Sequence, residues 1–252
     1  MAQEFGLNAA DWLAALWLVS VWMGYSLFAR RRARTSFCIA SALHYHRQQW
    51  MLAMLMRNNH ITDASLLTSL ERNASFLAST AILVIAGLVT TLASLEKVYI
   101  MLAQVPFART DLSPLKLQFK LLALLVIHVY SFFTFTWSMR QYGFCAVLVG
   151  AAPERPAAAE AQRYARNAAK VIDRAGHSYN AGLRAYYFSL AILAWLISNW
   201  LFMIAVAAVV GVLYGREFHS KTLKALVQVG NLTEADLPKR RAARAMPVDP
   251  PR

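Results

Sequence analysis

The feature that most constrains this chain is a long run without charged side chains near its C-terminal end. The 31 residues between Arg184 and Arg216 include no Asp, Glu, Lys or Arg. A helix of this length rises about 45 Å, which exceeds the roughly 30 Å thickness of the hydrocarbon core of a bilayer. The run therefore predicts an integral membrane protein, and the other apolar runs are interpreted as further spans or as helices packed against them.

The composition fits a membrane protein and argues against a nucleic-acid partner. Of the 252 residues, 58% are hydrophobic, and 26 Lys and Arg residues outnumber 13 Asp and Glu residues. A net charge of +13 in a soluble protein would suggest nucleic-acid binding. Here the basic residues gather in the connections between apolar runs, where they act as a topology signal. We therefore expect no nucleic-acid partner.

Four apolar runs have the length of a membrane span, and the third follows Ser113 and Pro114, a common helix start. The predicted spans cover residues 10–29, 76–95, 118–139 and 186–214. The predicted fold is therefore all-α, an integral membrane four-helix bundle with cytoplasmic amphipathic helices. It forms a single domain over residues 1–230, and the basic, Pro-rich residues 231–252 are predicted to be disordered.

Shorter helices are predicted between and after the spans. Residues 36–59 mix apolar with polar side chains and predict an amphipathic helix on the cytoplasmic side of the membrane. An Ala-rich helix is predicted over residues 157–174, with Gly176 as its end. Residues 218–229 predict a short amphipathic helix on the outer surface.

The distribution of Lys and Arg predicts the orientation of the chain. The connections 30–72 and 140–184 hold seven each, whereas the head before the first span holds none and the outer loop between the second and third spans, up to Lys116, holds three. Because basic residues stay in the cytoplasm, four spans place both termini in the periplasm. The eight basic residues from Arg216 onward count against this placement of the C-terminal end.

Polar side chains within the third and fourth spans are the candidate functional residues, because polar groups are costly to bury in lipid. His128, Lys120 and Ser131 share one face of the third span, and Asn199 lies near the middle of the fourth. We expect His128 and Asn199 to meet. Two interpretations stay open, a small hydrated site for a proton, ion or headgroup, and an interhelical hydrogen bond that stabilises the bundle by about 1 kcal/mol.

The histidines do not predict a cofactor. His128 is the only histidine within a span, so a bis-His haem would need a ligand from a second subunit. His44 and His46 are two residues apart and point to different faces of a helix, which is poor geometry for a metal. A cytoplasmic metal cluster would have to combine them with His60 and His177. We expect neither haem nor metal.

The sequence carries no recognised catalytic signature. It has no GxSxG, HExxH or glycine-rich phosphate loop, and no paired carboxylates at helical spacing. The two cysteines, Cys38 and Cys145, fall in predicted cytoplasmic positions, where thiols stay reduced, so we expect no disulfide. A non-enzymatic protein is favoured over an enzyme.

Several stretches resemble a known family. They are SYNAGLRAYYFSLAILAWLISNWLF, ERNASFLASTAILVIAGL, RQQWMLAMLMRN and LYGREFHS. Together they resemble domain-of-unknown-function family 599, a group of predicted bacterial and plant membrane proteins, over residues 11–220. The most specific positions are Asn180, Gly182, Leu183, Arg184, Tyr187 and Trp195. The resemblance implies four spans and an inner-membrane location, and it implies no activity or catalytic residues.

Within the family-like stretch, Arg184 marks the level of the inner headgroups. It can form an ion pair with an acidic residue of the cytoplasmic segments, for which the candidates are Asp63, Glu71 and Asp173. It can instead bind an anionic lipid headgroup beside other basic residues, Arg30, Arg31 and Arg72.

Two classes of function follow. The first is a non-enzymatic membrane subunit or scaffold in a homo-oligomer or a larger membrane complex. The alternative is a transporter or channel for a small solute, an ion or protons that uses His128 and Asn199. A continuous polar cavity would favour transport, and a dry core with an exposed apolar face would favour a partner protein.

Overall fold

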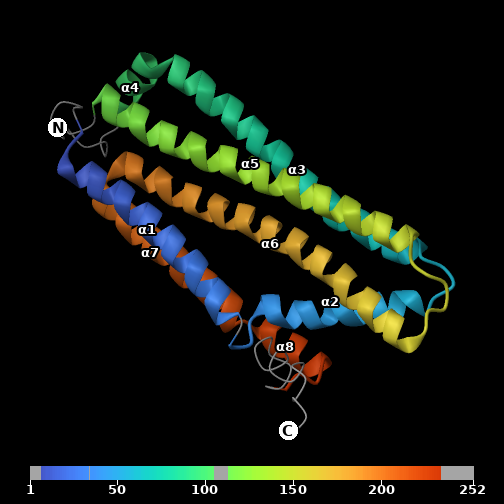
Figure 1. Ribbon diagram of the computed structural model, residues 1–252. Coiled ribbons are helices and arrows are strands. Elements are labelled where there is room, and N and C mark those ends of the chain that lie inside the picture. The colour runs from blue at the N-terminus through green and yellow to red at the C-terminus, as the bar shows by residue number, and fades with distance from the viewer. Residues whose placement is uncertain (1–6, 34, 105–112, 234–252) are drawn as a thin grey trace, which may run out of the picture.

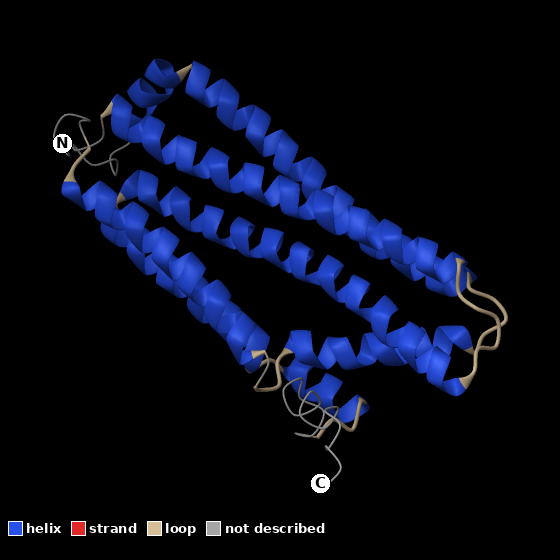
Figure 2. Cartoon of the chain, in the orientation of Figure 1, coloured by secondary structure: helices blue, strands red, loops and turns tan. Residues whose placement is uncertain are grey.

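The computed structural model describes residues 7–33, 35–104 and 113–233, and within them it is all-helical (Figures 1 and 2). The helices are α1 (Ala9–Arg32), α2 (Ile39–Leu55), α3 (Ile61–Ala93), α4 (Leu95–Ala103), α5 (Pro114–Gly150), α6 (Ala158–Ile197), α7 (Asn199–Phe218) and α8 (Lys221–Val229). Most of the predicted disordered tail, residues 234–252, lies outside the described residues.

Four helical segments in the described chain are long and apolar enough to cross a membrane. They are Ala9–Ala29, Ile61–Ala93, Pro114–Gly150 and Asn199–Val229. The all-α membrane fold is therefore confirmed. The predicted start of α5 is also confirmed, because Pro114 is its first residue and the Ser113 hydroxyl accepts a hydrogen bond from the Lys116 amide at 3.3 Å.

The fourth predicted span, 186–214, is not one helix. The α6 helix ends at Ile197, Ser198 is extended with φ −160° and ψ 142°, and α7 then folds back alongside α1 (Figure 1). A single extended residue thus divides the apolar run into the end of one helix and the start of the next. Hydropathy cannot detect this reversal, because both sides of the break are equally apolar.

Gly176 does not end a helix, as the sequence suggested, but lies inside α6, which continues for 40 residues. A Cβ at this position would lie 2.7 Å from Nη2 of Arg47, so the glycine allows the Arg47 guanidinium of α2 to lie against α6. Gly182 serves the same purpose further along, where an added Cβ would lie 2.6 Å from the Phe135 ring. Both glycines are therefore sites of close packing.

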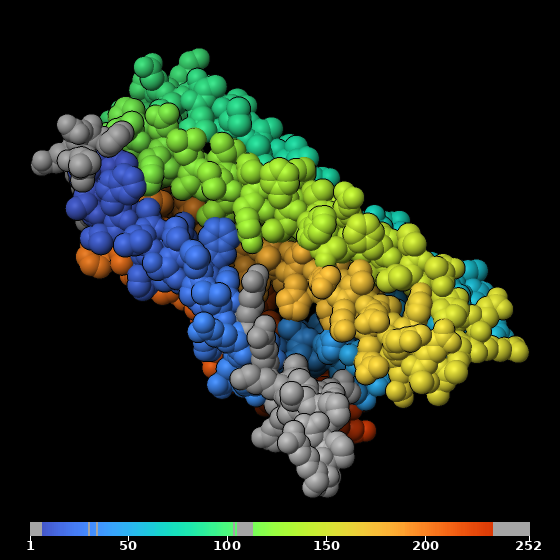
Figure 3. Space-filling view, viewed as in Figure 1, coloured from blue at the N-terminus to red at the C-terminus, as the bar shows by residue number. Residues whose placement is uncertain are grey.

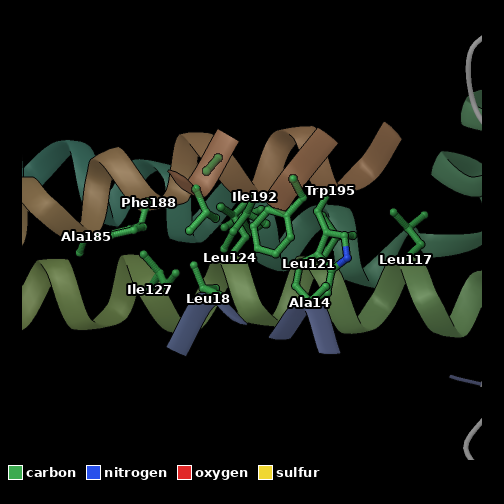
Figure 4. Packing of buried hydrophobic residues seen from close by; sticks show 14 residues of the cluster. Ala14, Leu18, Leu117, Leu121, Leu124, Ile127, Ala185, Phe188, Ile192 and Trp195 are labelled. Atoms are coloured by element: carbon green, nitrogen blue, oxygen red, sulfur yellow. The ribbon is translucent and has the colours of Figure 1, made fainter. Parts of the chain in front are cut away.

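One apolar core joins α1, α5, α6 and α7. Figure 4 shows Leu121 and Leu124 of α5 facing Ile192 and Trp195 of α6, with Ala14 and Leu18 of α1 beside them. The Trp195 ring stacks on Phe202 of α7 with centroids 4.6 Å apart and planes 5° apart, and neither residue is exposed. This packing fixes the hairpin that α6 and α7 form.

A second apolar core lies further along α5 and α6, where α2 covers them. Its members include Met51 and Met54 of α2, Leu67 of α3, Tyr142 of α5 and Ile172 of α6. The methionines of α2 thus fill a core. The space-filling view shows α6, in gold, between α1 and α5 (Figure 3). The α6 helix is therefore the element that links both cores.

The start of α1 and helix α8 lie at opposite ends of the bundle (Figure 1). Helices α1 and α7 run in the same direction. Asn199 contacts Asp11 at one end, and the ring centroids of Phe218 and Phe28 lie 6.1 Å apart at the other. Helix α8 packs on α2, where Nε2 of His46 lies 2.9 Å from the Leu226 carbonyl oxygen. The sequence placed both residues 218–229 and the N-terminal head on the outer side, whereas α8 and the start of α1 lie at opposite ends of the bundle.

Candidate functional site

A polar cavity of about 170 Å³ lies where α1, α5 and α7 begin and α6 ends. Its polar lining residues are Asn8, Asp11, Lys116, Lys120, Ser198 and Asn199. Three of them are charged and nearly inaccessible, with exposed fractions of 3% for Asp11, 8% for Lys116 and 6% for Lys120. Charged groups buried this deeply in a membrane protein are costly, which makes this cavity the candidate site.

The break at Ser198 creates one side of the cavity. In a continuous helix the Trp195 carbonyl would accept a hydrogen bond from the Asn199 amide. Because Ser198 is extended, this carbonyl instead accepts a hydrogen bond of 2.7 Å from Nζ of Lys120. The Lys120 ammonium also lies 5.8 Å from the centroid of the Trp195 ring. The lysine therefore closes the open end of α6.

Asp11 ties the three helix starts together. Its Oδ1 accepts a hydrogen bond of 3.0 Å from Nδ2 of Asn199, and its Oδ2 accepts one of 3.3 Å from the Asn8 amide. Nζ of Lys116 lies 3.8 Å from the same Oδ2. Asn199 in turn accepts a hydrogen bond of 2.9 Å from Nε1 of Trp195. A chain of hydrogen bonds thus runs from α6 through α7 to α1.

The structure brings together two of the four predicted intramembrane residues. Lys120 and Asn199 both line the cavity. His128 and Ser131 lie deeper in the bundle and bond within α5, His128 with the Leu124 carbonyl and Ser131 with the Ile127 carbonyl, each at 2.9 Å. The expected contact of His128 with Asn199 is therefore wrong. The reversal at Ser198 carries Asn199 to the end of the bundle.

Tyr186 occupies the place beside His128 that Asn199 was expected to take. The two rings lie 5.5 Å apart, and the Tyr186 hydroxyl donates a hydrogen bond of 2.8 Å to the Leu77 carbonyl of α3. Both interactions link helices of the bundle. His128 thus contacts a neighbouring helix through its ring, and its hydrogen bond stays within α5.

Sequence reasoning missed Asp11 and Lys116 as site residues. An acid in the first turn of a helix already has an explanation, because it favours the positive end of the helix dipole. The available signal was that both residues lie in the first turn of a predicted span that starts on the same side of the membrane. Charges at the same level of different helices can pair.

A second polar cluster lies in the other half of the bundle, between α2 and α6. The Asp173 carboxylate bonds His44 and accepts a hydrogen bond of 2.7 Å from Nη1 of Arg47. Burial opposes ionisation of Asp173, but the hydrogen bonds and charges of His44 and Arg47 outweigh it and hold the pKa of this carboxyl below its usual range. These contacts fasten α2 to α6.

A third cluster fastens α2 to the start of α3. Asp63 is fully buried, and its Oδ1 accepts hydrogen bonds from Nε1 of Trp50 at 2.6 Å and Nη1 of Arg57 at 2.7 Å. Asp63 and Asp173 are therefore not the partners expected for Arg184. That residue lies 11 positions beyond Asp173, about 16 Å along α6, and within electrostatic range of Tyr25.

The remaining ion-pair candidate for Arg184, Glu71, and the basic residues predicted to bind lipid headgroups lie on different helices. Glu71 is half-buried and Arg72 exposed on α3, and Arg31 is exposed at the end of α1. The Arg30 side chain and Arg34 lie outside the described residues.

Of the histidines expected not to bind a cofactor, His44, His46, His128 and His177 are engaged in hydrogen bonds, whereas the buried Nδ1 of His60 has no hydrogen-bond partner among the described residues. Nδ1 of His44 bonds Asp173, and its Nε2 lies 2.8 Å from Nε2 of Gln48. Among the residues that the structure describes, no three His, Cys, Asp or Glu side chains are grouped to hold a metal ion. The absence of a cofactor stays a prediction. Cys38 and Cys145 are both buried free thiols.

Comparison with known proteins gives a family and no further relative. The family model described as "Protein of unknown function, DUF599" matches residues 13–222, which include all the described residues of the cavity except Asn8, Ala10 and Asp11. No curated protein and no solved structure matches the chain. Because the family model covers most of the sequence, this membrane protein belongs to the DUF599 family.

Proposed function

We propose that this protein is a non-enzymatic integral membrane subunit that forms a homo-oligomer through α1 and α7. The observation that carries the proposal is a groove of about 710 Å³ between these two helices. Its walls include Gly24 of α1 and Gly211 of α7, and a Cβ added to either would meet nothing within 4 Å. Neither glycine is therefore required for packing within the chain.

Glycine in a membrane helix commonly allows another helix to approach closely. Gly176 and Gly182 serve that purpose inside this chain, whereas Gly24 and Gly211 face an open groove. The groove is lined mainly by apolar atoms and flanked by Tyr25 of α1. The apolar lining suits a transmembrane helix of a second copy, and the glycines would let that helix come close to both walls.

The inner part of the bundle favours a subunit over a transporter. Beyond the polar cavity, the space between the helices is filled by fully buried aromatic side chains, Phe135, Phe188, Trp195 and Phe202. A passage for a solute or ion past His128 would have to cross this packed region. Transport remains the second candidate function, and the broken α6–α7 hairpin beside the cavity is the observation in its favour.

We further propose that the chain crosses a bacterial inner membrane five times, with the N-terminus in the periplasm. The α6 helix runs beside α5 and packs its apolar C-terminal half into the shared core, so it supplies a crossing between α5 and α7. With five crossings, α8 lies in the cytoplasm with α2. The eight basic residues from Arg216 onward then follow the positive-inside rule, and Arg31 and Arg72 are available to anionic lipid headgroups.

Reporter fusions test the number of crossings. Green fluorescent protein joined to the C-terminal end is expected to fluoresce in bacterial cells, and alkaline phosphatase at the same position is expected to be inactive, because this end is cytoplasmic. Alkaline phosphatase inserted after Gln104, between α4 and α5, is expected to be active. Active phosphatase at the C-terminal end would support four crossings and contradict five.

Cysteine crosslinking tests the oligomer. In a chain with Cys38→Ser and Cys145→Ala, a single Gly24→Cys substitution is expected to give a disulfide-linked dimer when membranes are oxidised, because two copies of the groove meet there. The matched control is Leu83→Cys, which places a cysteine at a residue of α3 that is 73% exposed. Equal crosslinking at both positions, or none at Gly24, would place the subunit interface elsewhere.

A further inference from the structure

The polar cavity contains hydrogen-bond donors that have no acceptor among the described residues. The Asp11 carboxylate is already engaged, since Asn199 and the Asn8 amide each donate to one of its oxygens. The Lys116 ammonium lies 3.8 Å from Asp11, which is beyond hydrogen-bonding distance, and its side chain is only 11% exposed. The Lys120 ammonium uses one of its three donors on the Trp195 carbonyl. Among the described residues, the Lys116 ammonium therefore has no hydrogen-bonded acceptor and the Lys120 ammonium has one, and both lysines line one small space.

The cavity also carries an excess of positive charge. Its described lining holds two lysines and one aspartate. The N-terminus of α7 opens on it as well, and the residue before that helix, Ser198, makes no side-chain hydrogen bond to its first turn. The first backbone N–H groups of a helix have no acceptor within the helix, and they attract negative charge. The two lysines and the first turn of α7 thus favour an anion with several acceptor atoms, against the single negative charge of Asp11 and the C-terminal carbonyls of α6.

We propose that this cavity binds a small oxyanion, a carboxylate or phosphate group, between Lys116, Lys120 and the first turn of α7. A space of about 170 Å³ admits a group of a few non-hydrogen atoms. Asp11 does not ligate the anion but holds Asn199 and lies beside Lys116. The site goes beyond a role as a subunit and does not depend on it, since all its residues come from one chain.

The charge of the lining gives opposite expectations for two substitutions. Lys116→Met removes an ammonium that has no hydrogen-bonded acceptor among the described residues, and it is expected to weaken binding of inorganic phosphate at least about tenfold, the usual effect of losing a hydrogen bond to a charged group. Asp11→Asn keeps an oxygen for Asn199 and removes the competing negative charge, so it is expected to tighten binding. Misfolding cannot produce tighter binding, which separates the proposal from a purely structural role for these residues.

The measurement is calorimetric titration of the full-length protein in a non-ionic detergent with sodium phosphate, and separately with sodium acetate, at constant ionic strength. The matched control is Lys97→Met, which removes an exposed lysine of α4 at the same end of the bundle. Saturable binding that is lost in Lys116→Met, retained in Lys97→Met and strengthened in Asp11→Asn supports the site. Absence of binding by phosphate, acetate and lipid alike, or binding unaffected by Lys116→Met, overturns it.

The source of the oxyanion is distinguished by adding lipid. If a lipid headgroup supplies the phosphate, phosphatidylglycerol in mixed micelles should compete with sodium phosphate, and Lys116→Met should reduce the amount of this lipid that stays bound in native mass spectrometry. If a free solute is the ligand, phosphate or acetate should bind equally well with and without phosphatidylglycerol. Both results place the anion in the same cavity. Failure of the Gly24 crosslink would leave either result intact.

Discussion

Replacing Asp173 with Asn is expected to lower the free energy of unfolding by about 3–5 kcal/mol, because it leaves the Arg47 guanidinium without its carboxylate partner in a mostly buried position. The side chains of Asp173 and Arg47 are only 13% and 18% exposed. Thermal unfolding in detergent micelles measures the effect. Glu160→Gln is the matched control, since Glu160 is an exposed acid on the same helix and its loss should change little.

Acid should remove the same stabilisation from the wild-type protein. Because the pKa of Asp173 is lower in the folded state than the value of about 3.9 usual in unfolded chains, its ionisation stabilises the fold at pH values above that unfolded value. The contribution is lost as the pH falls through the folded pKa. The difference in unfolding temperature between wild type and Asp173→Asn should therefore shrink below about pH 4. A difference that stays constant on acidification would show that Asp173 acts through packing alone.

Replacing Trp195 with Ala is expected to cost about 3–5 kcal/mol, the range for deleting a large buried aromatic side chain. The substitution removes the stack with Phe202, the hydrogen bond to Asn199 and the ring beneath Lys120. Lipid is as apolar as the protein interior, so the loss comes from packing and polar contacts rather than from transfer out of water. The loss is measured by comparing the unfolding of Trp195→Ala and of the wild type in a denaturing detergent.

Two further variants separate the contributions of Trp195. Trp195→Phe keeps an aromatic ring against Phe202 and loses the hydrogen bond to Asn199, so it should cost less than Trp195→Ala. Trp137→Ala removes a tryptophan of α5 that is 53% exposed on the outside of the bundle, and it should cost little. Equal losses for Trp137→Ala and Trp195→Ala would mean that the α6–α7 hairpin does not depend on the buried stack.

The sequence indicated two residues of the polar cavity, Lys120 and Asn199, and did not indicate Asp11 and Lys116. Lys120 and Asn199 stand out because each interrupts an apolar run, which is a local property. Asp11 and Lys116 occupy first turns, where charged residues are common, so their sequence positions do not distinguish them. The pairing of His128 with Asn199 failed for a different reason. It assumed a continuous helix from residue 186 to residue 214, and the extended conformation of Ser198 moves Asn199 to another level of the bundle.

Composition and periodicity by themselves determined that this chain is a helical membrane protein, and they located the start of α5, because hydropathy and helix caps depend on residues close together in sequence. Only the tertiary structure decided where the apolar run after Arg184 reverses, which carboxylates hold α2, and at which end of the bundle α8 lies. Those features depend on contacts between residues far apart in sequence, such as Lys120 with Trp195 and Asp173 with His44. Such contacts set the direction of α7, and this direction decides which residues line the polar cavity.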